Sequence, residues 1–173
     1  SKICKMISKG KLRLRKIVSE DVDVLLQWEN NPENHKYSET PNYYSREMMQ
    51  DFVDSVHDIF VNNQLRLMIE WDGCVVGCID LFDFDPYHLR AGVGVLIDPE
   101  FRNKGMAKKS LLLLEVYAFK NLNINNLHCI ISVKNLVSIA LFKSCGYSLS
   151  GELKSWLKTK NNFTDVFYFQ KLH

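Results

Sequence analysis

Two alternating runs of apolar residues meet at a tight turn in the middle of the chain. The runs cover residues 66–71 and 74–81, with Asp72-Gly73 between them. A period of two predicts strands with one buried face, and an Asp-Gly pair between two such runs is a strong signal for a two-residue hairpin turn. The chain must therefore build an antiparallel sheet around this hairpin.

Strand and helix patterns alternate along the rest of the chain. Further strands are expected at 11–18, 88–97 and 127–133 and on either side of 160–162, and helices from Ser19 or Asp21 to 30, at 45–60, at 104–121 and at 135–145. The helix over 45–60 should bury Met48, Met49, Phe52, Val53, Val56, Ile59 and Phe60. This order predicts an α/β (α+β) fold with a mixed, mainly antiparallel sheet covered by helices. Residues 33–44 have no period and are expected to form a loop that faces a substrate.

Size and charge exclude several classes of protein. A chain of 173 residues, 46% of them hydrophobic, is expected to form a single domain over residues 1–173. The net charge of +2 is too small for a nucleic-acid binder. A basic cluster near the amino end is interpreted as a solvated arm rather than a recognition tail, and it contains Lys2, Lys5, Lys9, Lys11, Arg13, Arg15 and Lys16.

Neither a signal peptide nor a membrane span is expected. The amino-terminal charges interrupt any apolar run long enough for a signal peptide, and no later run approaches the length of a membrane span. We therefore expect a cytoplasmic protein with no membrane and no nucleic-acid partner.

The cysteines do not form a metal-binding or disulfide pattern. They are odd in number, lie in apolar segments and contain no Cys-x-x-Cys pair: Cys4, Cys74, Cys78, Cys129 and Cys145. We interpret them as buried free thiols, and no metal site is expected.

The segment from Asp98 to Ala107 indicates a binding site for phosphate groups. It joins a hydrophobic strand to an amphipathic helix, so unpaired backbone N–H groups gather at the helix start. Gly105 lets the backbone approach a ligand closely, and basic side chains surround it. The spacing is neither a Walker loop nor a Rossmann fingerprint. Gly92 and Gly94 lie inside the preceding strand, where they should permit a bulge or splay.

A second segment, residues 135–147, follows the next strand and begins at Asn135, an evident N-cap. Together the two segments resemble the GNAT superfamily of acyl-CoA-dependent N-acetyltransferases. The first matches the Arg/Gln-x-x-Gly-x-Gly/Ala loop of that superfamily with Arg102, Gly105 and Ala107. The second matches its Asn-x-x-Ser/Ala-x-x-Leu-Tyr-x-x-x-Gly-Phe segment with Asn135, Ser138, Leu141, Gly146 and Tyr147.

Within the superfamily the chain is most similar to the group of spermidine/spermine and ribosomal-protein alanine N-acetyltransferases. The resemblance implies a GNAT fold with six to seven strands and about four helices, and acetyl-CoA as co-substrate. The backbone of Val95, Leu96 and Ile97 would pair with the pantetheine arm. The pyrophosphate would be held by Arg102, Asn103, Lys104, Gly105, Met106, Ala107 and Lys108, with Asn135 and Ser138 lining the other side of the cofactor.

The acceptor amine would attack the thioester directly. A primary alkylamine has a pKa of about 10, so it must lose a proton before it attacks. The candidate bases are Glu39, Asp80, Asp83, Asp85 and His88, of which Glu39 and Asp83 are selected as catalytic. The alternative is that these groups are solvated loop residues. As a group they could form an anionic mouth for a cationic amine.

One position departs from the family pattern. The resemblance implies a Tyr that protonates the departing CoA thiolate, and this chain has Phe142 there. A phenyl ring donates no proton. Because thiolate is a tolerable leaving group, the loss should slow the reaction rather than abolish it, and water or Ser138 could substitute. Tyr147 is interpreted as a core residue.

Three functions remain open at this point. Acetyl transfer to a polyamine is favoured, and the alternatives are transfer to the amino terminus of a protein such as a ribosomal protein, or a weakly catalytic acetyl-CoA-binding domain. An unrelated nucleotide-binding domain is disfavoured. The carboxyl-terminal strands could pair with another copy of the chain to form a homo-oligomer, because they carry Phe163, Phe167, Tyr168 and Phe169.

Overall fold

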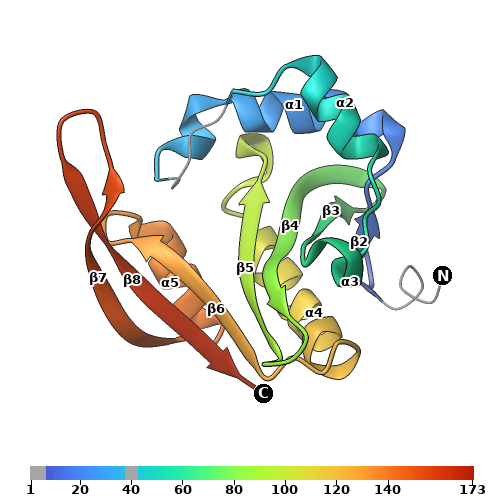
Figure 1. The fold of residues 1–173 in the computed structure, drawn as a ribbon. Helices are drawn as coiled ribbons and strands as arrows, with labels where there is room; N and C mark the ends of the chain where they lie inside the picture. The colour runs from blue at the N-terminus through green and yellow to red at the C-terminus, as the bar shows by residue number, and fades with distance from the viewer. Residues whose placement is uncertain (1–6, 38–42) are drawn as a thin grey trace.

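The structure is a computed structural model that describes residues 7–37 and 43–173, which form one eight-stranded sheet with helices on both faces (Figure 1). The strands are β1 (Ser8–Lys9), β2 (Leu12–Lys16), β3 (Leu65–Trp71), β4 (Cys74–Asp85), β5 (Arg90–Ile97), β6 (Asn126–Ser132), β7 (Ser148–Lys158) and β8 (Phe163–Leu172). The α-helices are α1 (Val22–Asn30), α2 (Arg46–Asp54), α3 (Ile59–Asn62), α4 (Met106–Lys120) and α5 (Leu136–Ser144). The predicted mixed architecture is confirmed, with one strand and one helix more than expected.

The strands follow the order β1-β2-β3-β4-β5-β6-β8-β7 across the sheet, and among the pairs of described strands only β5 and β6 run parallel. The predicted hairpin joins β3 to β4, and its turn residues Asp72 and Gly73 have φ values of 53° and 79°, which suit a hairpin turn of type I′. Helix α4 carries the chain from the end of β5 to the start of β6, which makes this pair parallel.

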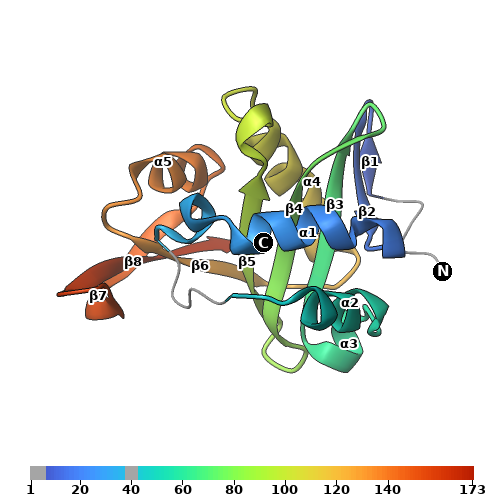
Figure 2. The same ribbon diagram turned by 90° about the horizontal axis from the view of Figure 1, so that it is seen from above.

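The helices divide into two layers (Figure 2). Helices α4 and α5 cover one face of the sheet, where Leu111 and Leu114 of α4 and Phe142 of α5 belong to the larger core cluster. Helices α1 and α2 cover the other face, where Trp28 and Met49 are buried with Met68 of β3 in a second cluster. None of the helices in the described ranges is long and apolar enough to cross a membrane.

The prediction of one helix over residues 45–60 is wrong for the second half of that range. Ser45 caps α2 as its position suggests, by accepting a hydrogen bond from the N–H of Met48 at 3.1 Å. The chain then leaves the helix at Ser55, whose hydroxyl donates to the carbonyl of Phe52 at 2.6 Å, and restarts at α3. Because of this break, Val56 and Phe60 are exposed although they were predicted to be buried. Met48, also predicted to be buried, lies within α2 before the break and is exposed to solvent.

Two further expectations need correction, and one cannot be compared with the described residues. Asp83 and Asp85 lie within β4 rather than in a loop, because β4 continues past an irregularity in its pairing with β5. Cys74 is exposed at the hairpin, whereas Cys78, Cys129 and Cys145 are buried free thiols as predicted. Cys4, Lys2 and Lys5 lie outside the described residues.

Candidate active site

The sheet opens between β5 and β6. The two strands pair over three positions, Arg90–Asn126, Ala91–Leu127 and Gly92–His128. Beyond Gly92, β5 continues to pair with β4 as far as Ile97. Over these same residues, 93–97, no pairing between β5 and β6 occurs in the described part of the chain. Strand residues direct their N–H and C=O groups alternately to the two sides, so every second residue between 93 and 97 directs its backbone groups toward this opening. The segment contains Val95, Leu96 and Ile97, which were predicted to pair with the pantetheine arm.

Gly92 has a steric role at the point where the strands separate. Phe82 of β4 is its partner in the ladder, and a Cβ atom at position 92 would lie 2.3 Å from Phe82 Cε2. At Gly94 the same ring would be 3.8 Å from a Cβ atom, an ordinary contact. The ring of Phe82 therefore covers both positions, and only glycine fits at 92. This agrees with the prediction that these glycines accompany a splay.

The segment after β5 is fixed by polar contacts. The indole Nε1 of Trp28 donates a hydrogen bond to Asp98 at 2.8 Å. Arg102, predicted to hold pyrophosphate, donates from Nε to the carbonyl of Ile97 at 3.0 Å and from Nη2 to Asn34 Oδ1 at 2.8 Å. Its exposed guanidinium therefore holds the loop in place beside the strand end, and its remaining N–H groups could reach a ligand.

The backbone at the start of α4 forms an anion-binding geometry. Asn103 and Gly105 have φ values of 62° and 77°, and Gly105 occupies the N-cap position, where no side chain caps the helix. The N–H groups of Met106, Ala107 and Lys108 belong to the first turn, in which a helix has no carbonyl to accept them. Together with the helix dipole they can bind an anion.

The side chains around this helix start differ in what they can contribute. Lys104 and Lys108 are exposed, and Lys104 Nζ lies 5.5 Å from the centroid of the Phe101 ring. Met106 is buried in the core, so only its backbone N–H is available to a ligand. Ala107 is half-buried and packs against the core.

Helix α5 begins at the corresponding end of β6. Asn135 Oδ1 accepts a hydrogen bond from the N–H of Ser138 at 3.2 Å, so Asn135 caps the helix as predicted. Because β5 and β6 are parallel, their carboxyl ends lie at the same end of the sheet. Helices α4 and α5 therefore both start at that end. In sheets with parallel strands, ligands bind in the crevice at these ends.

Phe142, at the position of the family's tyrosine, is buried with 4% of its surface exposed. Its ring packs edge-to-face against Tyr147, with 4.9 Å between the centroids and 89° between the planes. Burial raises the pKa of Tyr147, and the nearby carboxylate of Glu115 raises it further. Tyr147 is thus a core residue, as predicted.

Two of the proposed bases are already bound within the protein. Both oxygens of Asp80 accept hydrogen bonds from Arg66, at 2.8 Å from Nε and 2.9 Å from Nη2. Asp85 accepts from the N–H groups of His88 and Tyr87, and these bonds lower its pKa although desolvation opposes them. Arg66 also donates to Glu29 at 2.7 Å. Asp80 and Asp85 therefore serve first as structural ion-pair and turn residues.

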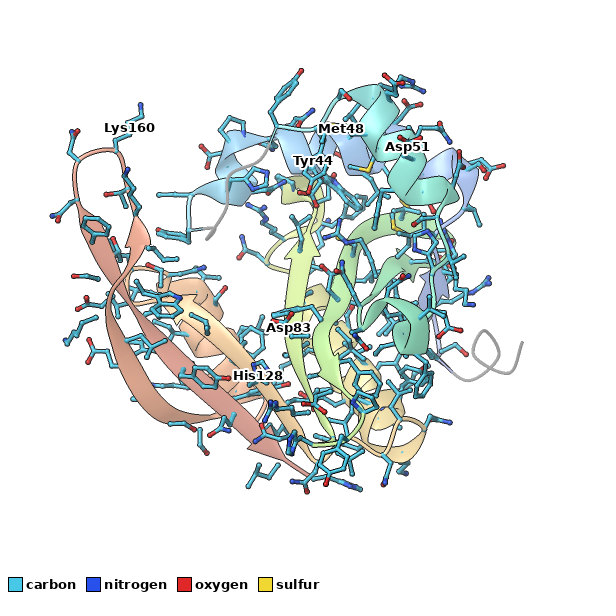
Figure 3. The ribbon with its side chains drawn as sticks, viewed as in Figure 1. Tyr44, Met48, Asp51, Asp83, His128 and Lys160 are labelled. Atoms are coloured by element: carbon cyan, nitrogen blue, oxygen red, sulfur yellow. The ribbon has the colours of Figure 1, made fainter. Side chains whose placement is uncertain are left out.

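The other candidates differ in position. His88 is exposed on the turn after Asp85, and Glu39 lies outside the described residues. Asp83 lines a pocket of about 780 Å³ at the end of the sheet where β5 and β6 meet (Figure 3). The pocket is also lined by Asn63, Phe84, Asp85, Pro86, Arg90, Asn126, His128, Tyr168 and Gln170.

His128 is a residue of this pocket that sequence reasoning missed. Its ring lies between two aromatic side chains, 6.4 Å from Phe82 edge-to-face and 5.6 Å from Tyr168 in a stacked arrangement. The alternation of residues in this strand could have indicated the position of His128, because its neighbours Leu127 and Cys129 are apolar and buried. Such a pattern places His128 on the sheet face opposite to theirs.

Comparisons with known proteins identify the family. Residues 11–148 match the acetyltransferase (GNAT) domain family. The chain belongs to the GNAT acetyltransferases. It is 30% identical over 149 residues to the spermidine N(1)-acetyltransferase of Escherichia coli K12, an alignment that covers 86% of this chain and 78% of that protein. This confirms the resemblance inferred from the two motifs.

Solved structures show the same fold. A spermidine N-acetyltransferase from Vibrio cholerae, in complex with CoA and spermine, superimposes with a TM-score of 0.86 at 23% identity, over 95% of this chain and 96% of that one. The ribosomal L7/L12 alpha-N-protein acetyltransferase RimL, in complex with coenzyme A, gives a TM-score of 0.84 at 19% identity, over 95% of each chain.

Proposed function

We propose that this acetyltransferase transfers an acetyl group from acetyl-CoA to a primary amine, with a polyamine such as spermidine as the favoured acceptor. The observation that carries this proposal is the opening between β5 and β6, which leads directly to the uncapped start of α4. The amide groups of a pantetheine arm can pair with the backbone edge of residues 93–97, as an added strand does. Its phosphates would then meet the N–H groups of Met106, Ala107 and Lys108.

This arrangement sets the course of the reaction. A backbone N–H of β5 that faces the opening stabilises the oxyanion formed when the amine attacks the thioester carbonyl. The C–N bond forms, the C–S bond breaks, and CoA leaves as a thiolate that takes up a proton. The buried ring of Phe142 supplies no proton, so the amine's own proton or water must serve.

Two observations support a polyamine acceptor. The pocket beside the opening is lined by the carboxylates of Asp83 and Asp85 and by one cation, Arg90, which pairs with Asp85, so the remaining negative charge favours a cationic ligand. The 30% identical relative is a spermidine acetyltransferase. We propose Asp83 as a contact for the ammonium groups, with Glu39 as a second contact. A protein amino terminus is the second candidate, favoured by the likeness to RimL.

A thiol-release assay tests the proposal. Acetyl-CoA is incubated with the protein and a panel of spermidine, spermine, aminoglycosides, amino acids and short peptides, and free CoA thiol is measured. We expect release that depends on spermidine or spermine and exceeds release with every peptide. Release only with peptides of certain first residues would favour the amino-terminal activity. Acetyl-CoA binding without release on any amine would identify a weakly catalytic binding domain instead.

A further inference from the structure

His128 lies at the point where the sheet opens. It is the partner of Gly92 in the last paired position of β5 and β6, and of Gln170 on β8. Partners in a ladder present their side chains to the same face of the sheet. Gly92 has no side chain there, so the imidazole of His128 is beside the first backbone groups of β5 that face the opening. This is where the proposed function places the reacting thioester.

The ring of His128 is held in a fixed orientation. Tyr168 of β8 stacks on one side at 5.6 Å with 22° between the planes, and Phe82 of β4 contacts it edge-to-face at 6.4 Å. Phe82 in turn rests on Gly92. A side chain held by rings from two neighbouring strands can act on a ligand without first losing rotamer freedom.

The surroundings of His128 favour its neutral form. Burial lowers its pKa below the usual 6.5, the carboxylate of Asp83 from β4 opposes that effect, and the guanidinium of Arg90 from β5 adds to it. Tyr168 is the titratable group that faces it from β8. The Oδ2 atom of Asp85 lies 3.3 Å from Nη2 of Arg90, so the carboxylate partly neutralises the charge of the guanidinium. At neutral pH the imidazole therefore carries a lone pair that can take a proton.

We propose that His128 is the base that accepts a proton from the acceptor's ammonium group. The inference rests on the proposed function and assigns a residue to its proton-transfer step. Asp80 and Asp85 are bound to Arg66 and to backbone N–H groups, so they are poorly placed to compete for this role. Asp83 holds the ammonium group and stabilises the imidazolium formed by the transfer.

The protons balance as follows. The ammonium group gives one proton to His128, and the neutral amine attacks the carbonyl carbon of the thioester. The tetrahedral intermediate collapses by breaking the C–S bond, and the nitrogen loses a second proton, which ends on the CoA sulfur. His128 releases the first proton to solvent. The products are the N-acetylated amine, CoA thiol and one proton, and no redox partner is required.

His128→Gln tests this role through the pH dependence of kcat/KM with spermidine. In the wild type we expect an acidic limb with a pKa below 6.5 that belongs to His128. In His128→Gln we expect a loss of about 10²-fold to 10⁴-fold at pH 7, because a positioned base contributes that factor. The remaining rate should rise about tenfold per pH unit toward the amine's own pKa of about 10. Acetyl-CoA affinity, measured by calorimetry, should be unchanged.

Two further variants keep the test decisive. His173→Gln removes another imidazole stacked on an aromatic ring, that of Phe119 in α4. His173 is not among the residues that line the pocket, so this variant should leave the rate and profile unchanged. Asp83→Asn should move the acidic limb to lower pH, because the carboxylate raises the pKa of His128. If Asp83→Asn instead abolishes the limb and His128→Gln keeps it, Asp83 is the base and the inference is overturned.

The outcomes also separate this inference from the proposed function. A wild-type protein that acetylates spermidine, together with a folded His128→Gln variant of equal rate and pH profile, overturns the role of His128 alone. A wild-type protein that binds acetyl-CoA and acetylates no amine overturns both. Folding of the variant is checked by its thermal midpoint.

Discussion

At the scale of single residues, Phe142 is the departure with the clearest chemical meaning. Its ring packs against Tyr147 in the core, with 4% of its surface exposed. The position could be read from the motif, but its burial could not, because burial depends on how α5 packs on β6 and β8. His128 shows the opposite case: its strand position was readable, whereas its neighbours come from β4 and β8 and are set by sheet order.

Phe142→Tyr is expected to retain acetyl-CoA affinity and not to lower turnover. The added hydroxyl either reaches the opening and donates a proton to the thiolate, or stays buried without a partner. The second case lowers the free energy of unfolding by about 1–3 kcal/mol, the usual cost of an unsatisfied buried group. Calorimetric titration, thiol release and urea unfolding measure the three quantities. A large loss of turnover at unchanged affinity and stability would show that position 142 is not near the sulfur.

At the scale of elements, the segments with strong local signals were predicted well. The hairpin at Asp72-Gly73, α4 and α5 lie within a few residues of their expected bounds, because turn and cap residues mark their ends. The helix expected over 45–60 failed because Ser55 and Asp58 bind neighbouring backbone groups and divide it. Side chains of this kind compete with helix hydrogen bonds, and an apolar period does not reveal the outcome.

The connection between β2 and α1 depends on Asp21, which is buried. Its carboxylate accepts hydrogen bonds from Arg15 at 2.7 Å and 2.9 Å and from the N–H of Val18 at 2.8 Å. Burial alone would raise the pKa of Asp21, but these bonds outweigh burial and lower it below 3.8. The folded state thus binds the ionised form more strongly, so this stabilisation is present above about pH 4 and is lost as pH falls through the folded-state pKa.

Asp21→Asn is therefore expected to lower the free energy of unfolding by about 1.5–3 kcal/mol at pH 7, the usual worth of hydrogen bonds to a charged group. The difference between wild type and variant should shrink as the pH falls below 4. Urea unfolding at a series of pH values measures it. A difference that stays constant from pH 7 to pH 2 would contradict the account of Asp21.

The loop before α4 gives a matched pair of variants. Gly105 has a φ of 77°, and a Cβ atom there would meet only Lys109 Cε, at 4.0 Å. Gly105→Ala adds backbone strain of about 1–2 kcal/mol but no charge, so acetyl-CoA affinity should fall by about 30-fold at most. Gly105→Glu adds a carboxylate among the N–H groups proposed to bind the pyrophosphate, and calorimetry should detect no binding. Affinity of wild-type strength in Gly105→Glu would rule out the pyrophosphate assignment.

At the scale of the whole molecule, the family could be inferred from two sequence motifs, and the fold places them after the neighbouring strands β5 and β6. The basic loop that follows β5, with Arg102, Lys104 and Lys108, lies toward one end of β5, and the acidic residues Asp83 and Asp85 lie toward the other end. The small net charge of +2 therefore averages two regions of opposite character. Composition alone could not reveal this, because the separation arises from strand direction in the folded sheet.

Association between copies stays a prediction at this scale. The edge strand β7 and its hairpin partner carry exposed apolar side chains, among them Leu149 at 53% and Phe163 at 56%. Two of the four aromatic residues in the predicted set turn toward the core, because Phe169 is fully buried and Phe167 is partly buried against the core cluster. Pairing of this edge with a second copy would cover these side chains.

The central claim is that acetyl passes directly from CoA to an amine bound beside the opening between β5 and β6. Mass spectrometry of the intact protein and of the small molecules, after mixing with acetyl-CoA with and without spermidine, tests it most directly. The account predicts an unmodified protein in both mixtures and, with spermidine, one N-acetylspermidine for each CoA released. An acetyl group retained on the protein, or CoA release without acetylated amine, would contradict it.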